Sequence, residues 1–164
     1  MGIRRLNAND ASFDAQFAAL PRVKVVPPEV EDLRTALSLP QWPEGVARLA
    51  LGGRTVDVIA APGHQPAHLI FYDDRTALLF TGDFLLPGRL MVDDLGAYRA
   101  SAQRLVTFLD DRPVSHVLGA HIELDTAGEL FSGGSQHHPN ERALALTKAD
   151  VVGLPKALAD FNGF

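Results

Sequence analysis

The sequence contains no cysteine among its 164 residues. This absence excludes disulfide bonds, cysteine-ligated zinc, iron–sulfur clusters and a thiol nucleophile. Any metal that the chain binds must therefore be held by imidazole nitrogens and carboxylate oxygens. The chain has six histidines and 20 acidic residues that can serve in that role.

Positive charge is also scarce, since 15 Lys and Arg stand against 20 Asp and Glu, a net charge of −5. Binding to nucleic acid phosphates requires a concentrated excess of cations, so we predict no nucleic acid partner. No apolar run approaches the roughly 18 residues of a membrane-spanning helix, and we expect no membrane partner. The first ten residues lack the apolar run of a signal peptide, and we therefore expect a cytoplasmic protein.

Two catalytic motifs are missing as well. No G-x-S-x-G segment is present, which argues against a serine hydrolase with a nucleophile elbow. No glycine-rich phosphate loop is present either, which argues against nucleotide binding.

The pattern that is present predicts one globular domain over residues 1–164, with 46% hydrophobic and 21% charged residues. Turn residues and apolar runs predict strands, and the Gly52-Gly53 pair between two such runs predicts a hairpin turn. Apolar residues at helical spacing predict helices, and we expect Asp93-Asp94 and Thr147 to cap two of them. We expect strands at 23–26, 47–51, 54–60, 67–72, 76–80 and 114–118, and helices at 29–37, 95–109 and 147–161. This order favours an α/β (α+β) fold with a mixed β-sheet and helices packed on it.

Three residues follow predicted strands directly after a small residue that lets the backbone turn: His64, Asp83 and His121. Functional groups in α/β sheets gather at such strand ends. Two imidazoles and one carboxylate suit zinc, iron or manganese without a thiolate. A Gly-His or Gly-Asp pair after a strand is more commonly only a turn. Composition and spacing alone leave these two interpretations evenly balanced.

A family resemblance favours the metal site. The segments APGHQPAH at 61–68, LFTGD at 79–83 and LGAHIE at 118–123 resemble the second half of the metallo-β-lactamase superfamily domain, most strongly over residues 46–123. The resemblance implies that His64 ligates a first metal, that His121 ligates a second and that Asp83 bridges the two, which makes Asp83 catalytic. The implied cofactor is zinc, as one or two ions, with iron or manganese as alternatives.

The same resemblance implies a metal-dependent hydrolase. A metal-activated water would attack an ester, thioester, lactone or related bond of a small-molecule substrate. His68 and Arg89 are weaker candidates for substrate binding. For His68 a hydrogen-bonded position beside the site is the favoured interpretation, and for Arg89 a surface salt bridge.

The sequence departs from the family in one important element. The family's His-x-His-x-Asp-His loop lies upstream, yet no histidine precedes His64. Either the loop is rewritten, with Asn7, Asn9, Ala11 and Ser12 at its four positions, or the loop and everything before it are absent from this sequence. Catalysis by this chain is therefore an open question. The alternative function is a non-catalytic, truncated or degenerate member that acts as a binding or assembly module.

The family fold is a four-layer sandwich of two sheets with helices outside. With essentially one sheet, this chain would form an incomplete metallo-β-lactamase-like sandwich and leave one apolar sheet face open. Exposed apolar faces of that size usually mark interfaces. We therefore expect a homo-oligomer that pairs through the open sheet face.

Overall fold

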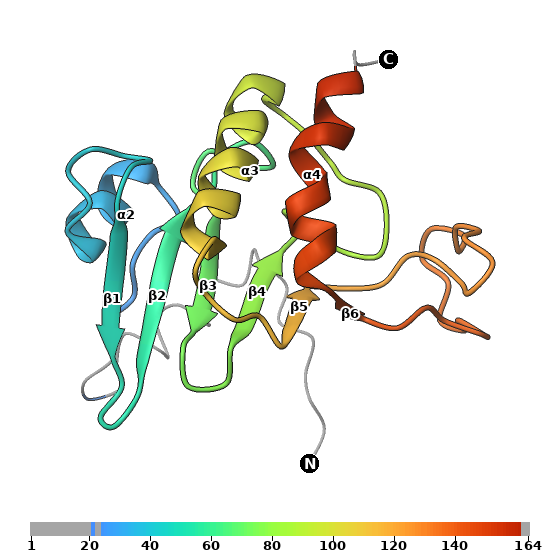
Figure 1. Ribbon diagram of the computed structural model, residues 1–164, viewed down its shortest axis with the longest axis horizontal. Coiled ribbons are helices and arrows are strands. Elements are labelled where there is room, and N and C mark those ends of the chain that lie inside the picture. The colour runs from blue at the N-terminus through green and yellow to red at the C-terminus, as the bar shows by residue number, and fades with distance from the viewer. Residues whose placement is uncertain (1–20, 22–23, 162–164) are drawn as a thin grey trace.

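The computed structural model describes Pro21 and residues 24–161. This part of the chain forms one mixed six-stranded sheet, in the order β1 to β6, with three helices (Figure 1). The strands are β1 (Val46–Ala50), β2 (Thr55–Ala60), β3 (Leu69–Asp73), β4 (Leu78–Gly82), β5 (His116–Gly119) and β6 (Ala145–Leu146). The helices are α2 (Val30–Leu37), α3 (Leu95–Leu109) and α4 (Lys148–Asp160). The predicted fold class, a mixed sheet with helices packed on it, is confirmed.

The first hairpin joins β1 and β2 in antiparallel register, with Ala50 opposite Thr55. The Leu51 N–H donates a hydrogen bond of 2.7 Å to the Arg54 carbonyl and closes the turn. Gly52 lies inside this turn at φ +71°, a conformation that side chains disfavour. The predicted glycine turn is therefore confirmed.

The second hairpin joins β3 and β4, with Asp73 opposite Leu78 at its closed end. The Asp73 carboxylate is only 1% exposed and accepts hydrogen bonds from the Arg54 guanidinium and the Thr76 hydroxyl. These bonds lower the pKa of Asp73 to about 2, and the bond from Arg54 makes the largest contribution. The carboxylate thereby holds the turn of one hairpin against the turn of the other.

Strand direction determines where the three candidate ligands lie. β2 and β4 are both antiparallel to β3, and β5 is parallel to β4. The carboxyl ends of β2, β4 and β5 therefore lie at one end of the sheet, which we call the site end. The closed turn at Asp73 lies at the opposite end, which we call the Asp73 end. A connection through α3 makes the parallel step from β4 to β5 possible.

One face of the sheet carries the main hydrophobic core. α3 and α4 lie side by side over this face (Figure 1). Helix residues such as Tyr98, Leu105 and Leu109 are fully buried against Ile70 and Leu79 of the sheet. The predicted apolar stripe of the 95–109 helix therefore lies where its spacing indicates.

Both core helices begin with side-chain caps. The Asp94 carboxylate accepts a hydrogen bond of 2.9 Å from the Ala97 N–H at the start of α3. Thr147 and Asp150 form a capping box at the start of α4. The hydrogen bonds from Thr147 lower the pKa of Asp150. The caps predicted at these two positions are confirmed.

The other face of the sheet is packed more sparsely. A smaller buried cluster of Leu39, Ala47 and Val58 lies there, and α2 has no fully buried residue. No side chain caps the start of α2 either. Pairing of this face with a second copy of the chain remains a prediction.

Several sequence expectations differ from the structure or lie outside it. The strand predicted at 23–26 is wrong for residues 24–26, which are irregular; Pro27 and Pro28, which follow directly, cannot donate ladder hydrogen bonds. The short strand β6 was not predicted. The four rewritten loop positions, Asn7, Asn9, Ala11 and Ser12, lie outside the described residues.

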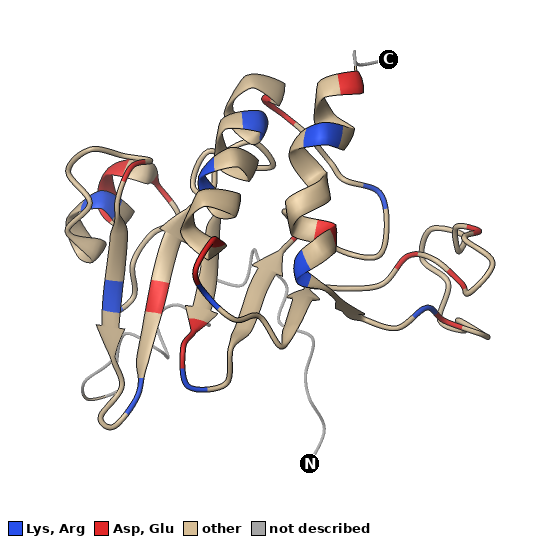
Figure 2. Ribbon diagram, in the orientation of Figure 1, with Lys and Arg blue, Asp and Glu red and all other residues tan. Residues whose placement is uncertain are grey.

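Charge and hydropathy add two observations. Figure 2 shows Lys and Arg distributed over several elements of the described chain instead of concentrated on one. Within the described residues, no helix has both the length and the apolar character needed to cross a membrane.

Candidate metal site

The loop that carries His64 depends on glycine at position 63. Gly63 has φ +136°, and a Cβ atom there would lie 2.4 Å from the Tyr98 Cα. The Gly63 carbonyl also accepts hydrogen bonds of 2.8 and 3.0 Å from the N–H groups of Asp93 and Asp94. The absence of a side chain thus lets this loop lie directly on the start of α3, with His64 at the site end.

The loops after β4 and β5 are tied to each other. The Ala120 N–H donates a hydrogen bond of 3.0 Å to the Gly82 carbonyl, one residue from each candidate ligand. Thr81 is fully buried, and its hydroxyl lies 2.6 Å from the Leu85 carbonyl oxygen and 3.2 Å from that of Leu118. This hydroxyl explains why the T-G-D sequence begins with threonine, since it links the loop after β4 to β5.

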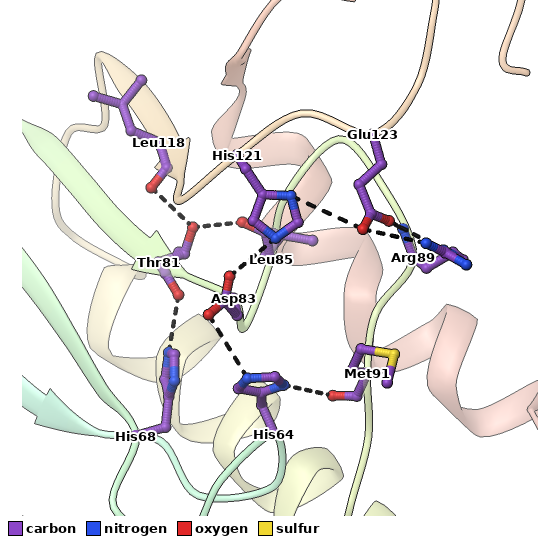
Figure 3. Close-up of polar contacts among 10 residues, drawn as sticks. All are labelled: His64, His68, Thr81, Asp83, Leu85, Arg89, Met91, Leu118, His121 and Glu123. Carbon is purple, nitrogen blue, oxygen red and sulfur yellow. Dashed lines mark hydrogen bonds and ion pairs between the residues drawn. The ribbon is translucent and has the colours of Figure 1, made fainter. Parts of the chain in front are cut away.

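These loops bring His64, Asp83 and His121 together at the site end (Figure 3). His64 Nε2 lies 3.7 Å from Asp83 Oδ2, and His121 Nε2 lies 3.2 Å from Asp83 Oδ1. The carboxylate therefore stands between the two imidazoles and faces each with a different oxygen. The Asp83 side chain is 43% exposed, so a small molecule can reach it.

The hydrogen bond on the far side of His64 fixes its tautomer. His64 Nδ1 lies 2.9 Å from the Met91 carbonyl oxygen, which can only accept. Nδ1 therefore donates, and in the neutral ring Nε2 carries a lone pair. That lone pair faces the Asp83 carboxylate, which is also an acceptor. Two acceptors that face each other at 3.7 Å cannot hydrogen-bond directly, so this gap can take a donor such as water, or a metal ion that both atoms ligate.

Glu123 provides a corresponding partner on the far side of His121, and we did not predict it. Glu123 Oε1 lies 4.0 Å from His121 Nδ1. The Arg89 backbone N–H and guanidinium donate hydrogen bonds of 2.9 and 3.2 Å to Glu123 Oε2 and lower the pKa of Glu123. The signal available in the sequence was the H-I-E segment, whose glutamate follows the histidine by two residues.

The two weaker candidates lie around this group in different ways. His68 Nε2 lies 3.0 Å from the Thr81 carbonyl oxygen, to which it donates, and its ring stands edge-on to His64 at 5.6 Å. Burial lowers the pKa of His68, so the ring is neutral near pH 7. His68 thus lies beside the site, where it supports the β4 end. Arg89 is 61% exposed and forms the salt bridge to Glu123.

The three candidate ligands meet in pairs around Asp83. No group of three or more His, Asp or Glu residues in the described chain is arranged around one point as metal ligands are. The donor set itself fits a divalent metal, because two imidazole nitrogens and one carboxylate are ligands that zinc accepts. The hydrogen bond from His64 Nδ1 to the Met91 carbonyl is also of the kind that orients metal-binding histidines, and at His121 the Glu123 carboxylate lies at 4.0 Å on the corresponding side.

Comparison with known proteins identifies the family. The sequence model of the family described as "Metallo-beta-lactamase superfamily" matches residues 9–141, which is most of the chain. The chain belongs to the metallo-beta-lactamase superfamily. Members of this superfamily generally bind metal ions, which agrees with the donor set at the site end.

Two relatives are named as thioesterases. The acyl-coenzyme A thioesterase MBLAC2 of Gallus gallus is 28% identical over 93 residues, which are 54% of this chain and 34% of the relative. An atrochrysone carboxyl ACP thioesterase of Claviceps purpurea is 40% identical over 55 residues, which are 33% of this chain and 18% of the relative. The matched segments thus span about a third or less of these relatives. The matches support a hydrolase family.

Solved structures of the superfamily resemble the chain in part. A metallo-beta-lactamase from Pontibacter korlensis is 14% identical, with a TM-score of 0.48 over 71% of this chain and 47% of that chain. A superfamily protein from Sulfolobus tokodaii is 26% identical, with a TM-score of 0.37 over 48% of this chain and 32% of that chain.

Proposed function

We propose that the chain provides the active site of a metal-dependent hydrolase that cleaves an acyl thioester. One observation carries the proposal: two imidazole Nε2 atoms face opposite oxygens of one accessible carboxylate, at 3.7 and 3.2 Å. The thioester class is supported by the names of the two relatives. The proposal thus selects the thioester among the ester, thioester and lactone bonds that the family resemblance left open.

His64, Asp83 and His121 would hold the metal. Three protein ligands with an open position are the number found at catalytic zinc sites, so this set suffices for one ion. A divalent metal bound there would lower the pKa of water and polarise the thioester carbonyl.

The chain's own residues keep this donor set in place. The Met91 carbonyl holds His64 in the tautomer whose Nε2 is free to ligate. Glu123, fixed by Arg89, places a negative charge beside His121 Nδ1 and favours the corresponding tautomer of that ring. The three donors thus follow β2, β4 and β5 at one end of the sheet, with Asp83 between the two imidazoles.

Hydrolysis of acyl thioesters tests the proposal. The chain is purified without added metal, and release of thiol from acyl-coenzyme A and acyl-N-acetylcysteamine is measured before and after zinc, iron or manganese is restored. His64→Ala is the site variant. His116→Ala is its matched control, because His116 is an exposed histidine at the start of β5, away from the site end.

Metal-dependent turnover that is lost in His64→Ala and kept in His116→Ala supports the proposal. Metal binding without turnover of thioesters, esters or lactones would overturn it in favour of the alternative function, a binding or assembly module. The experiment includes this alternative because no histidine precedes His64 in the sequence.

A further inference from the structure

A groove of about 720 Å³ runs between α2 and β3 and reaches the candidate metal site. Val30 and Leu33 of α2 form part of one wall, and Leu69 and Phe71 of β3 form part of the other. His64, His68 and Asp83 lie among its lining residues, so the groove and the site share one space.

The apolar side of α2 is only partly used for packing. Leu37, near its C-terminal end, packs against the smaller core cluster with Leu39 and Val58. Leu33, one turn earlier, and Val30, two turns earlier, are half-buried and line the groove. An apolar ligand in the groove would cover these residues and complete the burial of the apolar side of α2.

Charge restricts what the ligand can be. Among the described residues that line the groove, none is Lys or Arg, while Glu29 and Asp83 are acidic. An anionic head group would therefore be repelled, and a neutral, flexible chain would be accepted. The volume lies within the range of small-molecule sites, which are mostly apolar with a few polar groups that set orientation.

We infer that this groove binds the acyl chain of the substrate and places the thioester carbonyl at His64 and Asp83. The inference rests on the proposed function for the identity of the ligand, but the binding itself needs no catalysis. Its substrate class is an acyl thioester with an apolar chain long enough to pass along α2.

The test uses thioethers that cannot be hydrolysed: S-butyl-, S-octyl- and S-dodecyl-coenzyme A. Their dissociation constants are measured by calorimetry on the metal-free protein, so the head group is constant and only the chain changes. We expect the octyl compound to bind at least about tenfold more tightly than the butyl compound, since full burial of each methylene is worth about fourfold. Equal affinities for the three compounds would overturn the inference.

Two substitutions locate the binding. Val30→Trp fills the groove from α2, and Val152→Trp makes the same change on α4, where Val152 is 49% exposed on the opposite side of the sheet. Val30→Trp is expected to abolish the chain-length dependence, and Val152→Trp to keep it. Ala67→Leu, on the other wall, gives a second and smaller obstruction. Thermal unfolding verifies that each variant is folded.

The outcomes separate the inference from the proposed function. Chain-length-dependent binding that Val30→Trp removes supports the groove, even where no thioester is cleaved and the proposed function fails. Hydrolysis of short and long acyl thioesters with equal efficiency, unaffected by Val30→Trp, would overturn the groove and leave the proposed function standing. A change from dimer to monomer in Val30→Trp, measured by light scattering, would identify a second copy as the occupant and also overturn it.

Discussion

Two aspartates lie at opposite ends of the hairpin formed by β3 and β4, and their surroundings differ. Asp73 is 1% exposed and accepts hydrogen bonds from Arg54 and Thr76, so its charge is fully paired. Asp83 is 43% exposed and faces two imidazoles at 3.2 and 3.7 Å. The first carboxylate is neutralised by the protein itself. The second is left with partners that leave room for a cation.

This contrast separates stability from function along the sheet. At the Asp73 end, a charged group is buried together with its counterion, and removal of one partner leaves the other unpaired. At the site end, Asp83 and His121 are exposed, and the histidines are positioned by the Met91 carbonyl and by Glu123. We therefore expect substitutions at the Asp73 end to lower stability and leave metal-dependent activity unchanged. Substitutions at the site end should lower metal-dependent activity and leave stability largely unchanged.

The largest expected effect is that of Asp83→Asn. Its metal-dependent hydrolysis should fall by more than about 100-fold, because even loss of an outer partner of a ligand costs up to that much. Its stability should change little, since the carboxylate is exposed. Enzyme kinetics with thermal unfolding measures both. A strongly destabilised Asp83→Asn that retains activity would remove the distinction between the two ends.

Asp73→Asn should show the reverse pattern, with lower stability at pH 7 and unchanged metal binding. The pKa of Asp73 is lowered from 3.8 to about 2, so its ion pair stabilises the fold above pH 3.8. This contribution is lost as the pH falls from about 4 to about 2. Urea unfolding against pH should show the wild type and the variant converging over that window. A difference that stays constant down to pH 2 would contradict the assignment.

Glu123→Gln tests whether Glu123 positions His121 at the site end. Loss of the charge beside His121 Nδ1 should weaken zinc affinity by about tenfold, with the fold unchanged. Glu129→Gln is the matched control, because Glu129 is exposed in the segment between β5 and β6. Zinc titration should separate the two variants, and equal affinities would show that Glu123 does not position His121.

Thr147→Ala is expected to have the smallest effect, a loss of about 1 kcal/mol in the free energy of unfolding. The capping box that it breaks lies at the start of α4, where Lys148 contacts the C-terminal end of α3. Thr147→Ser should recover most of the loss. Zinc binding should stay unchanged in both variants, and a change in it would mean that the Asp73 end also controls the site.

Much of this arrangement could be predicted from the sequence because its signals are local. Gly52-Gly53, the stripe from Leu95 to Leu109 and the Thr147 cap each determine structure within a few residues. The candidate ligands could be named because each follows a strand and a small residue.

Long-range relations could not be predicted in the same way. The pairing of Asp73 with Arg54 joins residues 19 apart in the chain, and that of Glu123 with Arg89 joins residues 34 apart. The groove beneath α2 depends on how this helix packs over β3. The residue periodicity of the two segments does not predict that packing. The short strand β6 is defined only by its partner β5.

Zinc titration of the purified protein tests whether His64, Asp83 and His121 together hold a metal ion. Calorimetry and elemental analysis are applied to the wild type, to His64→Ala, Asp83→Asn and His121→Ala, and to His116→Ala as the control. We expect stoichiometric zinc in the wild type and in His116→Ala, and its loss in each of the three site variants. A wild type that binds no zinc, or three site variants that all retain it, would show that these residues are not metal ligands.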